Sequence, residues 1–188
     1  MKEFLPNLSR SNFWPILLVV LLGFSAYSFM LGGTFKHLDD QASIINNDDI
    51  KSFSNTVKIL KKPFFEEKYY YRPLVSLSFM AEYHLFGLNP FFYNLVNLLF
   101  HLATGIVVFF IVGRIFQDKA ISFFVSLLFV IHPIHWEAVS NIAGRSIVLC
   151  AFFTMSAFLF YLQSLVKKSK KIFYGLSIIC FVLSLLSK

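Results

Sequence analysis

Long apolar runs alternate with short polar segments along this chain, and the runs have the length of membrane-spanning helices. The first, 13–31, contains no charged residue and approaches the roughly 20 residues that a helix needs to cross a bilayer. A cleaved signal peptide is the alternative for this run, because Ala26-Tyr27-Ser28 has small residues at suitable spacing. Since more runs follow, we expect one all-α, polytopic membrane domain, 1–188. Its expected spans are 13–31, 91–112, 118–135, 147–166 and 172–187.

The segment 34–89 has mixed charge, and we expect it to be a loop that contains two helices. Asn47 or Asp48 can cap the first helix. Its apolar stripe has helical spacing and consists of Ile50, Phe53, Val57 and Leu60. Lysines flank this stripe, which fits equally a helix lying on a membrane surface and an amphipathic helix packed on protein. The second helix is expected to begin at Pro73 and to end before Gly87.

The third span is too short to cross the bilayer with its apolar core alone. As a helix, the apolar residues 120–131 cover about 18 Å of a hydrocarbon region about 30 Å thick. The span must therefore borrow residues from Asp118 on one side or from the segment 132–137 on the other. We expect 132–137, with the sequence HPIHWE, to lie at or just inside the membrane interface. Irregular backbone there needs protein or a water-filled cavity around it.

Composition supports a membrane protein and argues against a nucleic-acid binder. The 188 residues are 57% hydrophobic and 14% charged, whereas soluble domains carry about 25% charged residues. The net charge of +7 does not indicate nucleic acid, because the basic residues stand between apolar runs. Cys150 and Cys180 lie inside such runs, so we expect small buried hydrophobic side chains and neither a disulfide nor a metal site.

Basic residues concentrate in two short turns between expected spans, at Arg114 and Lys119 and in the segment 167–171. By the positive-inside rule these turns and the N-terminus are cytoplasmic. The loop 34–89 and the segment 132–145 then lie on the extracytoplasmic side, either periplasmic or ER-lumenal. The polar side chains expected on that side are Asp39, Asp40, Glu82, His132, His135, Glu137 and Arg145, with Asn94, Asn97 and His101 in the adjacent half of one span.

These residue types fit transfer of a group from a lipid phosphate carrier. A carboxylate can deprotonate a hydroxyl nucleophile or hold a divalent cation, and an arginine can bind a phosphate through two N–H groups. Acidic groups beside a bilayer core are costly, which favours a functional role for Asp39 and Asp40, although loop acids can also simply cap helices. Polar residues within a span can line a site or hold helices together. The histidine spacing is not a zinc signature, and the sequence leaves a metal undetermined.

An ordered series of motifs carries a resemblance to a known family. The motifs are Asp39-Asp40 followed by Ile44-Ile45-Asn46-Asn47, then Tyr71-Arg72-Pro73-Leu74, then 97–101, and finally 132–145. From about residue 36 onward, the series resembles the transmembrane-and-TPR O-mannosyltransferases and their prokaryotic relatives, of the GT-C glycosyltransferase superfamily. The resemblance implies an inverting enzyme that transfers a sugar such as mannose from a polyprenyl-phosphate donor, with dolichol or undecaprenol as carrier, to a hydroxyl of a protein or glycan acceptor.

The resemblance also implies roles for individual residues. The acidic pair would be catalytic, with Asp39 as general base and Asp40 assisting or positioning it. On charge grounds Arg72 and Arg145 are the candidates for binding the donor phosphate. The remaining site-lining candidates are Asn97, His101, His132, His135 and Glu137, and for the last three a structural role in a tight loop is the alternative. No cofactor is certain, and a divalent cation is the one that the acidic pair could hold.

The chain departs from the family pattern in two respects. Family members have more spans and usually a C-terminal array of TPR repeats, and no such repeat is present in this sequence. We therefore expect an N-terminal piece of a larger enzyme. The competing hypothesis is a non-catalytic membrane module, such as a transporter fragment or an assembly partner. Transport sites lie near the membrane midplane on broken spans, whereas the charged residues here collect at one interface, which favours the transferase.

Overall fold

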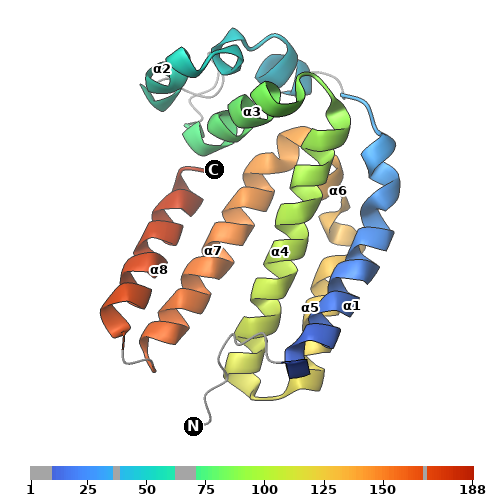
Figure 1. Cartoon of the computed structure of the whole chain (residues 1–188), viewed down its shortest axis with the longest axis vertical. Helices are drawn as coiled ribbons and strands as arrows, with labels where there is room; N and C mark the ends of the chain where they lie inside the picture. Colours follow the sequence, from blue (N-terminus) through green and yellow to red (C-terminus); the bar gives the residue numbers. More distant parts are fainter. Residues whose placement is uncertain (1–9, 36–38, 62–70, 167–168) are drawn as a thin grey trace.

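The computed structural model describes residues 10–35, 39–61, 71–166 and 169–188, and within these ranges it contains helices and no strand. Five helices stand side by side as a bundle, and short helical segments cross one end of it (Figure 1). The predicted all-α helical bundle is confirmed. The five helices are α1 (Arg10–Tyr27), α4 (Pro90–Phe116), α5 (Lys119–Ile131), α7 (Arg145–Ser164) and α8 (Lys170–Leu185).

Three helical stretches in the described ranges are long and apolar enough to cross a membrane. They are Asn12–Gly32, Pro90–Phe116 and Ile142–Ser164. A fourth exists if Lys119–Ile131 and Pro133–Ser140, which meet at an angle of 43°, form one bent span. These stretches coincide with the first four predicted spans. At the fifth, α8 has 16 residues, or about 24 Å, less than the roughly 30 Å of a hydrocarbon core, so its crossing stays a prediction.

Side-chain caps set the boundary between α4 and α5. The α4 helix starts at Pro90 and ends where Gln117 adopts a left-handed conformation with φ 57°. The next residue, Asp118, accepts hydrogen bonds from the backbone N–H groups of Ala120 (2.7 Å) and Ile121 (3.0 Å). A capping carboxylate satisfies N–H groups that have no partner within the helix. The turn is therefore tight, and α4 and α5 pack against each other.

The backbone bends after α5, in the segment where the sequence predicts irregular structure. A single 3₁₀ turn, η5 (Pro133–His135), connects α5 to the short α6 (Trp136–Ser140). Two carbonyls at the break accept hydrogen bonds from other helices: His132 O from the Tyr27 hydroxyl (3.0 Å) and Val130 O from His101 Nε2 (2.9 Å). Buried carbonyls need such partners. The predicted irregular backbone is confirmed, and protein side chains stabilise it.

Val130 of α5 packs directly against a glycine of α1 and a glycine of α4. A Cβ atom added to Gly23 of α1 would lie 2.1 Å from Val130 Cγ1, and one added to Gly105 of α4 would lie 2.2 Å from Val130 Cγ2. Only glycine leaves room at such distances. Small residues let membrane helices pack with close backbones, so this contact fixes the spacing of the three helices.

Small polar side chains connect α7 and α8. Thr154 and Ser184 share a hydrogen bond of 2.7 Å, and the Ser177 hydroxyl donates to the Ala157 carbonyl over 2.8 Å. Serine and threonine commonly connect membrane helices in this way. The two cysteines, predicted to be buried, are half-buried free thiols.

The loop differs from its prediction in one of its two helices. The second helix is confirmed as α3 (Pro73–Phe86), and Gly87 ends it with φ 61°. The first is divided into η3 (Asp48–Lys51), η4 (Phe53–Asn55) and α2 (Thr56–Lys61). Asn47 caps η3 as expected, but the Ser52 side chain accepts from Ser54 N and interrupts the helix. The expected single stripe was therefore wrong: Ile50 is buried, whereas Phe53, Val57 and Leu60 are exposed.

Candidate functional site at one end of the bundle

The segments that carry the candidate residues meet at one end of the bundle. The loop elements η3, α2 and α3 lie there, together with α6 and the start of α7 (Figure 1). The α4–α5 turn and the start of α8, which carry basic residues, lie at the opposite end. Residues far apart in the sequence are thus brought to the same face, and the polar groups at that end define the candidate site.

The acidic pair divides into one exposed and one buried carboxylate. Asp39 is exposed, whereas Asp40 is only 1% exposed and its Oδ1 accepts a hydrogen bond from the backbone N–H of Ala143 (3.0 Å). A single turn, η2 (Gln41–Ile45), follows the pair, and Ile44 anchors that turn in the hydrophobic core. Asp40 therefore connects the first loop to the segment between α6 and α7, and Asp39 beside it faces outward.

The segment 139–145 is the second part of the site, and side chains from two directions hold it. Asn97 of α4 donates from Nδ2 to the carbonyls of Asn141 (2.9 Å) and Val139 (3.4 Å). The short 3₁₀ turn η6 (Ile142–Gly144) follows, with the Asn141 side chain as its cap. A Cβ added to Gly144 would lie 2.4 Å from the Ala138 carbonyl oxygen, so this position requires glycine. The segment is therefore fixed against α4.

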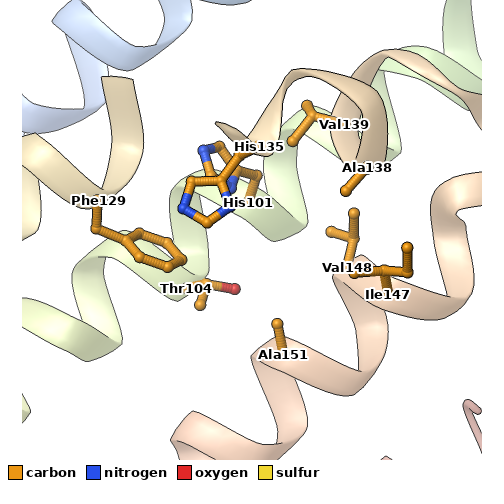
Figure 2. Close-up of a pocket in the computed structure, with 9 residues that line it drawn as sticks. All are labelled: His101, Thr104, Phe129, His135, Ala138, Val139, Ile147, Val148 and Ala151. Atoms are coloured by element: carbon orange, nitrogen blue, oxygen red, sulfur yellow. The ribbon is translucent and has the colours of Figure 1, made fainter. Parts of the chain in front are cut away.

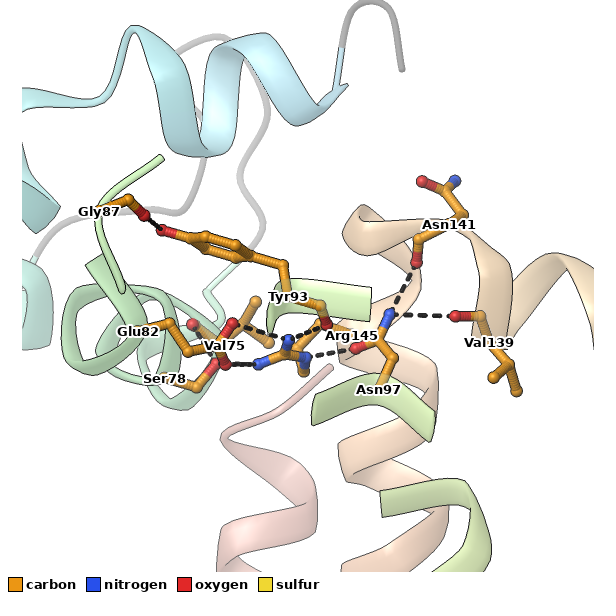
Figure 3. Close-up of polar contacts among 9 residues, drawn as sticks. All are labelled: Val75, Ser78, Glu82, Gly87, Tyr93, Asn97, Val139, Asn141 and Arg145. Atoms are coloured by element: carbon orange, nitrogen blue, oxygen red, sulfur yellow. Dashed lines mark hydrogen bonds and ion pairs between the residues drawn. The ribbon is translucent and has the colours of Figure 1, made fainter. Parts of the chain in front are cut away.

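Arg145, the first residue of α7, has a fully buried side chain with a complete set of partners (Figure 3). Its Nη1 donates to Glu82 Oε1 and to the Ser78 hydroxyl (3.1 Å), and its Nη2 donates to Glu82 Oε2 (3.1 Å) and to the Tyr93 carbonyl (2.9 Å). Its Nε donates to Asn97 Oδ1. These bonds use all five N–H donors of the guanidinium. In this arrangement Arg145 has no N–H group left for a donor phosphate.

Glu82 is the partner of Arg145, and the sequence analysis grouped it with the other candidate residues without assigning it a role. It lies on α3, outside the candidate spans, and is 5% exposed. Burial raises the pKa of the Glu82 carboxyl, while the charge and hydrogen bonds of Arg145 act in the opposite direction. A lone carboxylate on an otherwise apolar helix was the available signal, because a buried charge needs a partner.

Two histidines line a cavity of about 140 Å³ between α4, α7 and the bend after α5 (Figure 2). The rings of His101 and His135 have centroids 5.3 Å apart, and Phe129 lies beside His135 at 4.7 Å. Apart from these histidines and Thr104, the lining is apolar. His101 bonds to the Val130 carbonyl at the bend through Nε2, so the structure gives it a packing role. Of the two histidines in the 132–145 motif, His135 lines the cavity and His132 does not.

Three candidate residues remain: His132, Glu137 and Arg72. His132 is exposed, and its Nδ1 accepts from the Ile134 N–H (3.2 Å), which supports an ordering role in the tight turn. Glu137 is exposed on α6. Arg72 is half-buried and precedes α3, which places it about 15 Å along the helix axis from Glu82. Among the described residues, no group of three or more His, Cys, Asp or Glu is placed to hold a metal ion.

Named relatives match the chain over most of its length. Protein O-mannosyl-transferase TMTC3 of Mus musculus is 36% identical over 162 residues, which are 81% of this chain and 17% of the relative. Protein O-mannosyl-transferase TMTC1 of Homo sapiens is 35% identical over 150 residues, which are 74% of this chain and 17% of the relative. Protein O-mannosyl-transferase F38B6.6 of Caenorhabditis elegans is 30% identical over 160 residues, which are 79% of this chain and 23% of the relative. This chain is a homologue of the protein O-mannosyl-transferases.

The family resemblance drawn from the motifs is thereby confirmed. The chain spans 17–18% of the length of the TMTC3 relatives of mouse and human. Neither a family model nor a solved structure matches it. Together with the apolar helices, the O-mannosyl-transferase relatives identify an integral membrane protein.

Proposed function

We propose that this chain forms part of a membrane glycosyltransferase that transfers a sugar, such as mannose, from a polyprenyl-phosphate donor to a hydroxyl of a protein or glycan acceptor. The names of its relatives support the transferase class and the mannose. The structural observation that carries the proposal is the acidic pair, in which Asp40 is anchored on the Ala143 N–H and leaves the neighbouring Asp39 exposed at the end of the bundle.

In the proposed reaction, Asp39 acts as general base. The acceptor hydroxyl attacks the anomeric carbon of the sugar from the side opposite the phosphate and transfers its proton to the Asp39 carboxylate. A bond forms between the acceptor oxygen and the anomeric carbon, and the bond to the phosphate oxygen breaks. The polyprenyl phosphate leaves with the bonding electrons, and the configuration at the sugar is inverted.

The proposed roles of the remaining candidates follow their positions. Asp40 holds Asp39 in place rather than reacting. Arg72 is proposed for the donor phosphate on the ground of its charge alone, whereas all N–H groups of Arg145 donate to protein acceptors. His135, which lines the cavity beside His101, is proposed to line the site. We place this end of the bundle on the extracytoplasmic side, since the basic turns lie at the other end.

The test is transfer of radiolabelled mannose from dolichyl and undecaprenyl phosphate donors in membranes that express the chain, alone and extended by the downstream genomic sequence. Replacing Asp39→Asn removes the base but keeps the side-chain size. We expect transfer to fall by about 10²–10⁴-fold, the usual contribution of a positioned general base. Insertion into the membrane should be unchanged, because Asp39 is exposed.

The matched control is Asp48→Asn. Asp48 is an exposed carboxylate in the same loop, paired with Lys51 at 2.7 Å, and its removal should leave transfer unchanged. Undiminished transfer by the Asp39→Asn form would exclude Asp39 as the base. If no form transfers sugar while all insert correctly, the competing hypothesis of a non-catalytic membrane module is favoured.

A further inference from the structure

We propose that the buried ion pair between Glu82 and Arg145 positions the acidic pair, so that both are positioning residues for the transfer reaction. This inference rests on the proposed function. It assigns a task to Glu82 and replaces phosphate binding by Arg145 with a role exerted through the backbone. Neither side chain touches the substrates.

A continuous series of contacts leads from the ion pair to Asp39. Arg145 is two residues beyond Ala143, whose N–H donates to Asp40, and Asp40 is covalently adjacent to Asp39. The intervening Gly144 packs against the Ala138 carbonyl without room for a side chain. The start of α7 therefore cannot shift without moving the N–H group that anchors Asp40.

The ion pair joins three elements at one point. Glu82 and Ser78 come from α3, Asn97 and the Tyr93 carbonyl come from α4, and Arg145 comes from α7 (Figure 3). Asn97 extends the network, because the amide that accepts from Arg145 also donates to the carbonyls of Asn141 and Val139. The segment 139–145 is thus held at both of its ends by the same network.

The chemistry of the pair suits positioning better than ligand binding. The guanidinium is fully buried and lies over the Phe79 ring at 5.1 Å from the centroid. A buried charge that loses its partner is strongly unfavourable, so a satisfied buried pair permits few alternative geometries. Planar, two-point recognition by arginine adds a fixed orientation. The ion pair therefore selects one placement of α3 and its loop relative to α7.

The experiment combines kinetics with cysteine accessibility in Glu82→Gln. Ser43, 1% exposed in the turn after the acidic pair, is replaced by cysteine to report opening of that turn. Ser126, fully buried between α5 and α4, is replaced by cysteine in a separate chain to report global unfolding. Both chains carry Cys150→Ala and Cys180→Ala, and maleimide labelling is measured in detergent.

We expect Glu82→Gln to accelerate labelling at position 43 by about tenfold or more and to leave the labelling rate at position 126 unchanged. The reason is that the turn around position 43 can open locally without unfolding of the whole chain. The kcat for sugar transfer should fall by about tenfold or more while KM for the donor changes less than about twofold, since the ion pair does not bind donor. Glu82→Asp keeps the charge, so it should accelerate labelling and lower kcat less than Glu82→Gln does. Asp48→Asn should change neither labelling nor kcat.

Equal acceleration of labelling at positions 43 and 126 would overturn the inference, because it indicates global destabilisation. Unchanged labelling and kcat in Glu82→Gln would overturn it as well. A rise in KM alone would also contradict it, because that result indicates a lost binding contact. Failure of the proposed function is distinguishable. If the unsubstituted chain transfers no sugar, the transferase proposal fails, and the labelling comparison still decides whether the ion pair holds the acidic turn.

Discussion

Replacing Arg145→Met tests the energetic importance of the buried network most directly. The change removes five hydrogen-bond donors and leaves the Glu82 carboxylate, the Asn97 amide oxygen and the Tyr93 carbonyl without them. Removing one partner of a buried ion pair costs about 3–5 kcal/mol, because the other charge stays buried. At about 2–4 °C per kcal/mol for a chain of this size, the melting temperature should fall by roughly 6–20 °C.

The assay is thermal unfolding of the purified chain in detergent, followed by near-ultraviolet circular dichroism, for a double-mutant cycle. Glu82→Met leaves the guanidinium unpaired and should destabilise to a similar extent. The chain with methionine at both positions contains no buried charge and is expected within about 1–2 kcal/mol of the unsubstituted protein, since apolar replacements of buried pairs are often neutral. The two single losses together exceed the loss of the double variant, so the expected coupling energy between the two positions is at least about 4 kcal/mol.

Additive effects would refute the reasoning. If the double variant loses the sum of the two single losses to within about 0.5 kcal/mol, the two side chains do not interact energetically. A single loss below about 1 kcal/mol would equally contradict a fully buried and fully bonded arginine, because even one unsatisfied buried acceptor costs about 1–3 kcal/mol.

Two further predictions concern the helix contacts and are checked by the same melting experiment. Gly105→Ala should destabilise the folded chain by about 1–3 kcal/mol, because its Cβ would lie 2.2 Å from Val130 Cγ2. Adding Val130→Ala to the same chain should restore part of the lost stability. The control is Gly175→Ala, where nothing lies within 4 Å, and it should be neutral or stabilising by about 0.5–1 kcal/mol. Tyr27→Phe should cost about 0.5–1.5 kcal/mol through loss of the hydrogen bond to the His132 carbonyl, and an unchanged melting temperature would contradict that contact.

Sequence patterns predicted the helices that are long or bounded by strong signals. The apolar runs located the bundle helices, and Pro73 and Gly87 delimited α3 because proline suits a first helical position and glycine accepts a positive φ. The first loop helix was predicted incorrectly, because a hydrophobic stripe alone ignores competing side-chain hydrogen bonds. The Ser52 hydroxyl bonds to Ser54 N and ends the helical path after four residues.

The sequence predicted which residues gather at the candidate site better than it predicted the role of each residue. Charge and topology gathered Asp39, Asp40, Glu82 and Arg145 at one end, and the structure brings the last three into one connected cluster. The role of Arg145 depends on a partner 63 positions earlier, and no local spacing encodes that pairing. An arginine beside a membrane interface has the same sequence signature whether it binds a ligand or a buried carboxylate.

The bend after α5 has a consequence for the order in which the chain assembles during synthesis. The carbonyls exposed by the break are satisfied by Tyr27 of α1 and His101 of α4, both of which emerge from the ribosome before α5 does. Unsatisfied backbone is costly within a membrane. The earlier helices must therefore already be in the bilayer, and close enough to receive α5, when the broken span leaves the insertion machinery. Biogenesis of this chain is expected to proceed through a three-helix intermediate of α1, α4 and α5, on which α7 and α8 subsequently pack.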